Sequence, residues 1–218
     1  MGYQHRPLQP HRRINAIGAA YFVTSVTHER QEHFREPAFA ELAVCDLWFA
    51  AKLNQFSLIG YTILPQHVHL LARRTGKTTL SKFVGSFKRN IARDINDLIW
   101  ERPHVRKPRA GADDSNRPLQ ENYLMTAKTH PWLTFQDYQS HFLWVATIKD
   151  QFRRTDHRKK DLTWFQWQKS FHDHLIRDQP DLDRHLKYIR FNAVRHKLTE
   201  EPGKWRWMWI VGMTEPAI

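Results

Sequence analysis

The sequence predicts an α+β fold, a ferredoxin-like sandwich in which a four-stranded, mainly antiparallel sheet carries helices on one face. Strand-like and helix-like segments follow the order β-α-β-β-α-β-α, with an insertion before the last strand. A length of 218 residues with 41% hydrophobic content suits one domain with such an insertion. The predicted parts are a basic N-terminal arm (1–18), the first part of the domain (19–100), the insertion (101–163) and the rest of the same domain (164–218).

The first half of the chain supplies three strands. Residues 21–27 are β-branched and aromatic, which is typical of a strand. Pro37 suits the first turn of a helix that continues to about Lys52. Two further strands, 56–64 and 67–72, are predicted on either side of a short connection.

The clearest helix covers 80–98, where apolar residues recur at three- and four-residue intervals. Lys82, Lys88, Arg89 and Arg93 fall on the rest of its surface. They are candidates for contacts with a nucleic-acid backbone, and a solvated charged face is the alternative.

The second half begins with the insertion. Residues 102–118 are rich in Pro, Arg, Asp and Gly and predict a loop, and apolar spacing over 138–152 predicts one helix. Mixed strand character covers 165–176, including 171–176. A last helix is expected from near Pro180, with Asp178 as its cap. The Trp-rich tail after it is expected to pack over the core.

The charge balance indicates a polyanionic partner. Lys and Arg number 34 against 22 Asp and Glu, a formal net charge of +12. Nucleic acid is the expected partner, and a charge that only maintains solubility is the alternative. Arg12, Arg13, Arg184 and Arg195 join the candidate DNA contacts. No signal peptide or membrane span is visible, so we expect a cytoplasmic, nucleoid-associated protein without membrane contact. The single cysteine excludes an intrachain disulfide.

The stretch that contains His67 and His69 is the strongest chemical signal. On a strand these two side chains point to the same face, where two imidazoles can hold one divalent metal ion. The alternative is a half-exposed strand whose histidines bind no metal. Tyr188 and Asn192 stand four residues apart on the last helix. Asn192 could supply a third ligand, and Tyr188 could attack a phosphodiester as nucleophile to give a 5′-phosphotyrosine and a free 3′-hydroxyl.

Five blocks of the sequence together resemble the REP-associated tyrosine transposases, which are relatives of the single-strand insertion-sequence transposases with an HUH motif and one catalytic tyrosine. The blocks occur in the family's order, at 21–24, 65–71, 86–89, 171–177 and 188–192. Three positions depart from the family pattern, because Gln66, Ala193 and Lys197 replace the usual Asn, Pro and Gly.

The resemblance implies a metal-binding pair at His67 and His69, a catalytic Tyr188 and an amide ligand at Asn192. It also implies Mg²⁺ or Mn²⁺ as cofactor, a ferredoxin-like fold, and a monomer or homodimer that recognises single-stranded or hairpin DNA. The predicted function is therefore a metal-dependent tyrosine transposase that cleaves and rejoins single-stranded DNA. A catalytically silent hairpin-DNA or RNA binding protein on the same scaffold is the alternative.

Overall fold

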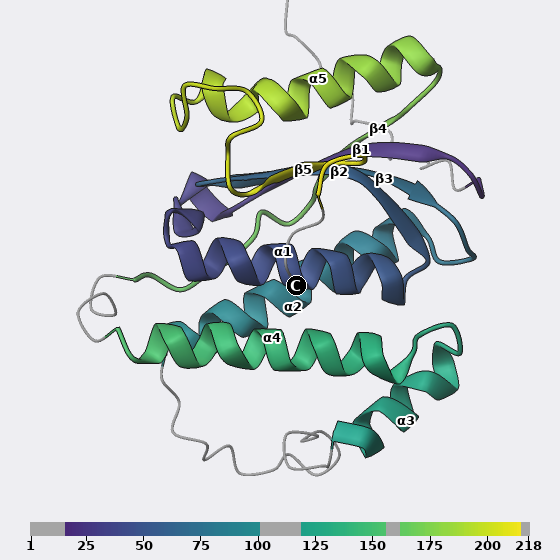
Figure 1. The fold of residues 1–218 in the computed structure, drawn as a ribbon, viewed down its shortest axis with the longest axis vertical. Coiled ribbons are helices and arrows are strands. Elements are labelled where there is room, and N and C mark those ends of the chain that lie inside the picture. The colour runs from purple at the N-terminus through teal and green to yellow at the C-terminus, as the bar shows by residue number, and fades with distance from the viewer. Residues whose placement is uncertain (1–15, 101–118, 156–161, 215–218) are drawn as a thin grey trace, which may run out of the picture.

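A computed structural model describes residues 16–100, 119–155 and 162–214 of the chain. The predicted basic arm with Arg12 and Arg13, and the predicted loop over 102–118, lie almost entirely outside these residues. In the described part, one sheet separates two groups of helices (Figure 1).

The sheet has five strands in the order β4-β1-β3-β2-β5, and each neighbouring pair is antiparallel. The strands are β1 (Ala20–Val26), β2 (Phe56–Leu64), β3 (His67–Arg74), β4 (His172–Leu175) and β5 (Met208–Ile210). The first four have the order expected of a ferredoxin-like sandwich, and β5 extends the sheet beyond β2. The predicted α+β class is confirmed.

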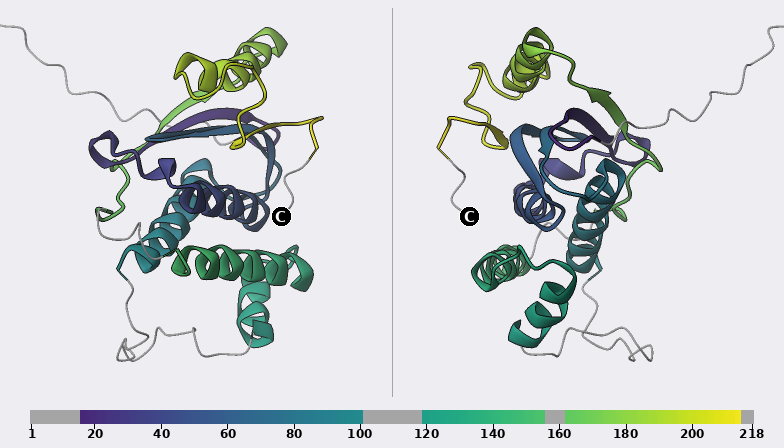
Figure 2. Two further views of the ribbon diagram at one scale, coloured as in Figure 1. Left: turned by 60° about the vertical axis from the view of Figure 1, so that its left-hand side comes forward. Right: turned by 90° about the vertical axis from the view of Figure 1, so that its right-hand side faces the viewer.

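Helices α1 (Pro37–Leu53) and α2 (Leu80–Ile99) cover one face of the sheet, and α5 (Gln179–Arg195) covers the opposite face (Figures 1 and 2). Pro37 occupies the first turn of α1, as predicted, and Thr79 caps α2 by accepting a hydrogen bond from Lys82 N. Two short 3₁₀ segments, η1 (His28–Arg30) and η2 (His33–Arg35), connect β1 to α1.

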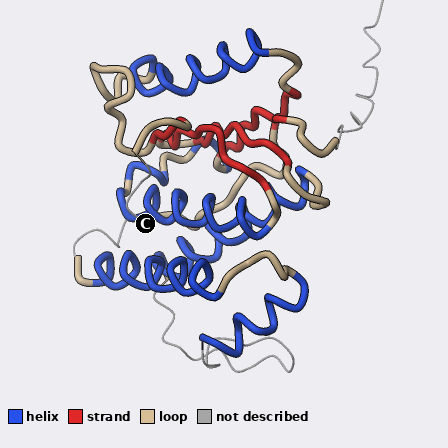
Figure 3. Tube along the Cα trace, turned by 45° about the vertical axis from the view of Figure 1, so that its right-hand side comes forward, coloured by secondary structure: helices blue, strands red, loops and turns tan. Residues whose placement is uncertain are grey.

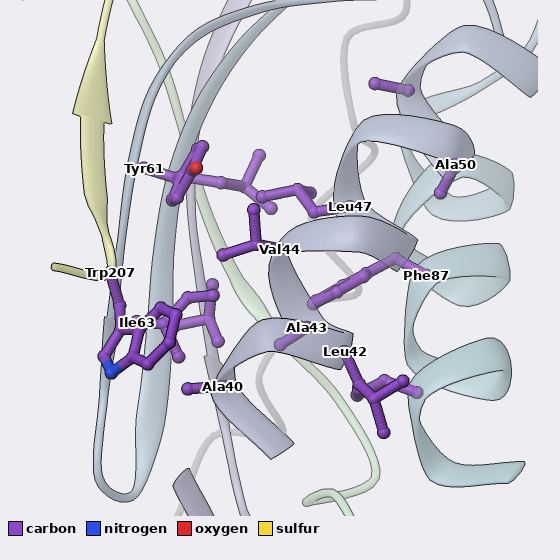
Figure 4. Packing of buried hydrophobic residues seen from close by; sticks show 14 of the residues in the cluster. Ala40, Leu42, Ala43, Val44, Leu47, Ala50, Tyr61, Ile63, Phe87 and Trp207 are labelled. Carbon is purple, nitrogen blue, oxygen red and sulfur yellow. The ribbon is translucent and has the colours of Figure 1, made fainter. Parts of the chain in front are cut away.

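The main core lies between the sheet and α1, and continues to α2. Figure 4 shows Leu47 and Val44 of α1 directed toward Tyr61 and Ile63 of β2, with Phe87 of α2 on the far side of α1. All five side chains are buried. Because Val68 and Leu70 of β3 belong to this same cluster, the histidines that alternate with them must face the other side of the sheet.

Helices α3 (Leu119–Thr129) and α4 (Phe135–Arg153) lie within the predicted insertion and form a further layer outside α1 and α2 (Figure 3). Polar contacts tie α4 to the core: His141 Nε2 lies 3.0 Å from Asp46 Oδ1, and Lys149 Nζ lies 2.7 Å from Asp94 Oδ1. Helix α4 includes the whole of the helix predicted over 138–152.

Two details of the predicted architecture are wrong. The sheet has five strands instead of four, because the segment Met208–Ile210 of the Trp-rich tail pairs with β2. The helices also do not all share one face. The apolar residues of α5 form a second cluster on the opposite face, around Ile189 and Leu71. The expectation that the tail packs over the core is confirmed, since Trp207 and Trp209 are buried.

Candidate functional site

The two histidines of β3 converge on one point. Strand β3 lies between β1 and β2 at this position. His67 pairs with Val26 and Leu64, and His69 pairs with Thr24 and Thr62. The two Nε2 atoms lie 3.0 Å apart, and both side chains are buried. The Oγ1 atom of Thr24 lies 2.8 Å from Nδ1 of His69, which fixes the orientation of that ring. Both Nε2 atoms are therefore aimed at the same position.

Both imidazoles are neutral near pH 7. Burial is the largest cause that lowers the pKa of His67 to about 4, and the nearby His196 and Arg30 act in the same direction. Burial also lowers the pKa of His69 to about 3, with His67 and His196 as further causes. A metal ion binds the neutral form of imidazole, so these rings need not lose a proton first.

Helix α5 crosses the same face of the sheet. Its first turn is capped by Asp178, whose side chain accepts a hydrogen bond of 2.8 Å from Asp181 N. Its apolar side packs on β2 and β5, where Ile189 lies over Gly60. A Cβ atom at Gly60 would lie 3.5 Å from Ile189 and 3.2 Å from the carbonyl oxygen of Trp209, so a larger residue would push these elements apart.

This packing brings Tyr188 against the histidine pair. Its hydroxyl oxygen lies 3.4 Å from Nε2 of His69, and the two rings meet edge to face with centroids 5.0 Å apart. Phe22 of β1 contacts both rings, at 5.7 Å from Tyr188 and 5.3 Å from His69. The guanidinium of Arg195 lies 5.3 Å from the centre of the Tyr188 ring. The predicted phenol and imidazoles are thus brought together in one chain.

Asn192 lies on α5 one turn after Tyr188. Tyr188 and Asn192 are four residues apart and share one side of α5, and His196, the residue that follows the helix, comes four residues later. Since Tyr188 contacts His69 and the His196 ring lies 5.4 Å from that of His67, we infer that Asn192, which lies between them in the sequence, is directed toward the histidine pair. Asn192 is 1% exposed, and among the described residues its Oδ1 atom has no hydrogen-bond partner.

These groups fit a divalent metal ion. Two neutral imidazoles and an amide oxygen are suitable ligands for such an ion. A hydrogen bond at the second ring nitrogen orients a ligating histidine, and Thr24 Oγ1 occupies that position beside His69 Nδ1. A buried oxygen without a partner is costly unless something else binds it. A cation at the point where the Nε2 atoms converge would satisfy Asn192.

A second cluster lies at the start of α5. The ligand atoms of His174, Asp181 and His185 all lie within 4.8 Å of one another. Asp181 is buried, however, and already pairs with Arg177 at 3.1 Å and Arg184 at 2.9 Å. Its hydrogen bond with His174, followed by those with the two arginines, holds the pKa of this carboxyl well below its usual range. Two guanidinium groups on one carboxylate oppose a cation here, so the first cluster is the better metal site.

The predicted cations divide between the two sides of the sheet. Arg184 and Arg195 lie on α5 near Tyr188, whereas Lys82, Lys88, Arg89 and Arg93 lie on α2, across the sheet from the histidine pair. Lys88 donates from Nζ to the carbonyl oxygens of Gln168 and Ser170, at 2.7 and 3.1 Å. Arg93 pairs with Asp94 at 3.2 Å. Any role of the α2 cations in DNA contact is therefore separate from the Tyr188 site.

Three residues that border the site were not predicted from the sequence. Thr24 and Phe22 were assigned to a strand without a role, and the signal for both is their alternation on β1, which places them on the histidine side. His196 was also missed, although its four-residue spacing after Asn192 was visible. Within the described part of the chain, no helix combines the length and apolar character that a membrane span requires.

Comparison with known proteins identifies similar sequences and a similar fold. Residues 17–109 match the family model described as "Transposase IS200 like". A Haemophilus influenzae protein whose name assigns it to the REP-associated tyrosine transposases is 37% identical over 70 residues, which are 28% of this chain and 40% of that protein. The chain thus aligns with less than half the length of this relative.

A solved structure has the same fold. It is titled "Structure of the REP associates tyrosine transposase bound to a REP hairpin", and it superposes with a TM-score of 0.53 at 15% identity, covering 92% of this chain and 82% of the other. The fold, the family match over 17–109 and the relative agree with one another. The resemblance of this chain to the REP-associated tyrosine transposases of the IS200-like family is therefore confirmed.

Proposed function

We propose that the chain is a metal-dependent tyrosine transposase that cleaves and rejoins single-stranded DNA beside a hairpin. The observation that carries this proposal is the distance of 3.4 Å between the Tyr188 hydroxyl and Nε2 of His69. The hairpin is proposed by analogy with the solved relative, whose title names a REP hairpin. We expect the protein to act on chromosomal DNA at the nucleoid.

His67, His69 and Asn192 would hold the metal ion, with Mg²⁺ or Mn²⁺ as the expected species. Bound there, the ion would act as a Lewis acid that offsets negative charge on the phosphate under attack. Thr24 keeps the His69 ring oriented through its hydrogen bond to Nδ1. Phe22 packs against both His69 and Tyr188 and limits their movement.

Tyr188 would be the nucleophile. Its oxygen forms a bond to phosphorus while the bond from phosphorus to the 3′ oxygen breaks, the phenol proton passes to water, and the 3′ oxygen takes up a proton. Arg195 beside the Tyr188 ring favours the negative charge that develops on the phenol oxygen. Attack of a 3′-hydroxyl on the phosphotyrosine reverses the reaction and rejoins the strand. Because one chain supplies every group, a monomer suffices for one cleavage.

Incubation with a labelled REP-type hairpin that carries single-stranded flanks, in the presence of Mn²⁺, tests the proposal. The intact protein should form a covalent protein–DNA adduct that resists denaturant, and Tyr188→Phe should bind the same DNA without forming it. Binding by both proteins with no adduct from either would support the catalytically silent binder instead. Cleavage that persists in Tyr188→Phe would indicate a hydrolase that uses an attacking water.

A further inference from the structure

A cavity beside Tyr188 extends past the nucleophile to residues that the cleavage steps described above do not use, among them His185 and Arg184. Its volume is about 510 Å³, which is within the range of small-ligand sites in proteins. Three of its lining residues are rings and three are cations: Phe22, His185 and Tyr188, and Arg184, Lys187 and Arg195. Aromatic surface next to positive charge is the combination that binds single-stranded nucleic acid.

The aromatic part of the cavity is held in place from behind. The Phe22 ring lies 4.6 Å from that of His185. His185 in turn stacks on His174 of β4, with centroids 4.8 Å apart and planes 23° apart, and its Nδ1 atom lies 2.8 Å from the carbonyl oxygen of Asp181. The rings of Phe22 and His185 are therefore fixed by three elements of the fold before any ligand arrives.

Three cations of α5 line the cavity beside its rings. Arg184 is held by a hydrogen bond of 2.9 Å to Asp181, and Arg195 lies over the Tyr188 ring. Arg184, Lys187 and Arg195 are exposed residues of α5. A cavity that carries rings inside and cations around Tyr188 matches the chemistry of one nucleotide unit.

We propose that this cavity binds one unstacked nucleotide of the single-stranded DNA, next to the phosphate that Tyr188 attacks. The inference rests on the proposed function for the position of that phosphate. The base would stack on Phe22 and His185, while the adjacent phosphates contact the cations of α5. A base within a duplex is already stacked on both faces, so it cannot enter. The cavity would thus select single-stranded DNA.

Photocrosslinking tests the proposal without requiring cleavage. The probe is an oligothymidine that contains 5-iododeoxyuridine, bound to the intact protein, irradiated, digested and mapped by mass spectrometry. The expected crosslink lies on the peptide that contains Phe22 or on the one that contains His185. It should disappear when the probe is annealed to oligodeoxyadenosine. Crosslinks only at the exposed pair Trp100 and Trp164, whose rings lie 5.8 Å apart, would overturn the proposal.

Variants make the test independent of catalysis. Phe22→Leu should weaken oligothymidine binding by about fivefold or more, since stacking on one ring is worth roughly 1 kcal/mol or above. Phe22→Tyr keeps the ring and should bind like the unchanged protein. Arg184→Gln should weaken binding and reduce its dependence on salt. Equal affinity of Phe22→Leu and Phe22→Tyr would contradict the proposal.

The two proposals fail in different ways. Absence of an adduct on hairpin DNA, together with crosslinking at Phe22, would remove the transposase function and leave the base-binding cavity. An adduct at Tyr188 without crosslinking at Phe22 or His185 would leave the reaction and remove the cavity. Thermal melting of Phe22→Leu provides the control for folding, because a variant that melts like the unchanged protein must lose binding through the cavity itself.

Discussion

The hydroxyl oxygen of Tyr188 lies 3.4 Å from Nε2 of His69, although the two residues are 119 positions apart in the sequence. Strand β3 fixes one partner and helix α5 the other, and the whole of the predicted insertion lies between them in the chain. The described helices of this predicted insertion, α3 and α4, pack outside α1 and α2 on the opposite side of the sheet from α5, so they leave the contact intact (Figure 2).

Asn192 gives a prediction in which stability and metal binding change in opposite directions. Asn192→Leu removes a buried amide oxygen without a partner and should raise the free energy of unfolding of the metal-free protein by about 1 kcal/mol. It should also reduce the rise in melting temperature caused by Mn²⁺. Asn192→Asp, which keeps an oxygen ligand, should retain that rise. Calorimetry with and without Mn²⁺ measures both effects. A full Mn²⁺ effect in Asn192→Leu would contradict the ligand assignment.

The hydrogen bond between Thr24 Oγ1 and His69 Nδ1 predicts an effect on metal affinity. Thr24→Val keeps the shape of the side chain but removes the group that orients the His69 ring, so Mn²⁺ affinity should fall by about 10-fold or more. Ser25→Ala is the matched control, because Ser25 is the next residue on β1 and points to the other face. Isothermal titration with Mn²⁺ measures both affinities. Equal losses in the two variants would indicate a general effect on β1.

Asp46 predicts a pH dependence of folding stability. Burial raises the pKa of its carboxyl from 3.8 to about 6, against the opposing hydrogen bond from His141. The folded state therefore holds this proton more tightly than the unfolded state. Protonation of Asp46 thus contributes to the free energy of unfolding at low pH, and this contribution is lost as pH rises from about 4 to 6. The free energy of unfolding of Asp46→Asn, relative to that of the unchanged protein, should therefore increase by roughly 1 kcal/mol between pH 5 and pH 8. Urea denaturation at both pH values measures it.

A matched control for this pH effect is Asp150→Asn, which removes an exposed carboxylate from α4. Its stability relative to the unchanged protein should vary little over the same pH range. If Asp46→Asn and Asp150→Asn followed the same pH curve, the buried position of Asp46 would not be the cause.

Gly60 predicts how closely α5 must approach the sheet. In Gly60→Val the added side chain would collide with Ile189 and with the Trp209 backbone, so α5 and β5 would move outward. We expect a loss of stability of roughly 1–3 kcal/mol and a larger loss of adduct formation than of DNA binding. Denaturation and the adduct assay on the same preparation measure both. Unchanged adduct formation in a folded variant would show that the position of α5 is not critical.

Local patterns were sufficient to predict most elements of the fold. The three- and four-residue spacing identified α2, alternation identified the face of His67 and His69, and Asp178 marked the start of α5. These features depend on neighbours in the sequence, so they can be read from it.

Features that depend on distant contacts were not predictable. Strand β5 has three residues, and only its pairing with β2 makes it a strand. The position of α5 over the histidines depends on Ile189 packing near Gly60, a contact that no local spacing encodes. For the same reason Lys88 was expected to be available to DNA, whereas its ammonium binds two backbone carbonyls.

The most direct test of the central claim is to identify the residue that carries the DNA. The adduct formed with Mn²⁺ is digested with protease and nuclease, and mass spectrometry locates the peptide residue that still carries a nucleotide through its phosphate. We predict a 5′-phosphate linked to the oxygen of Tyr188, and no adduct from His67→Ala or His69→Ala. A linkage to any other residue would contradict the account. So would a Tyr188 adduct that forms equally well in His67→Ala and His69→Ala.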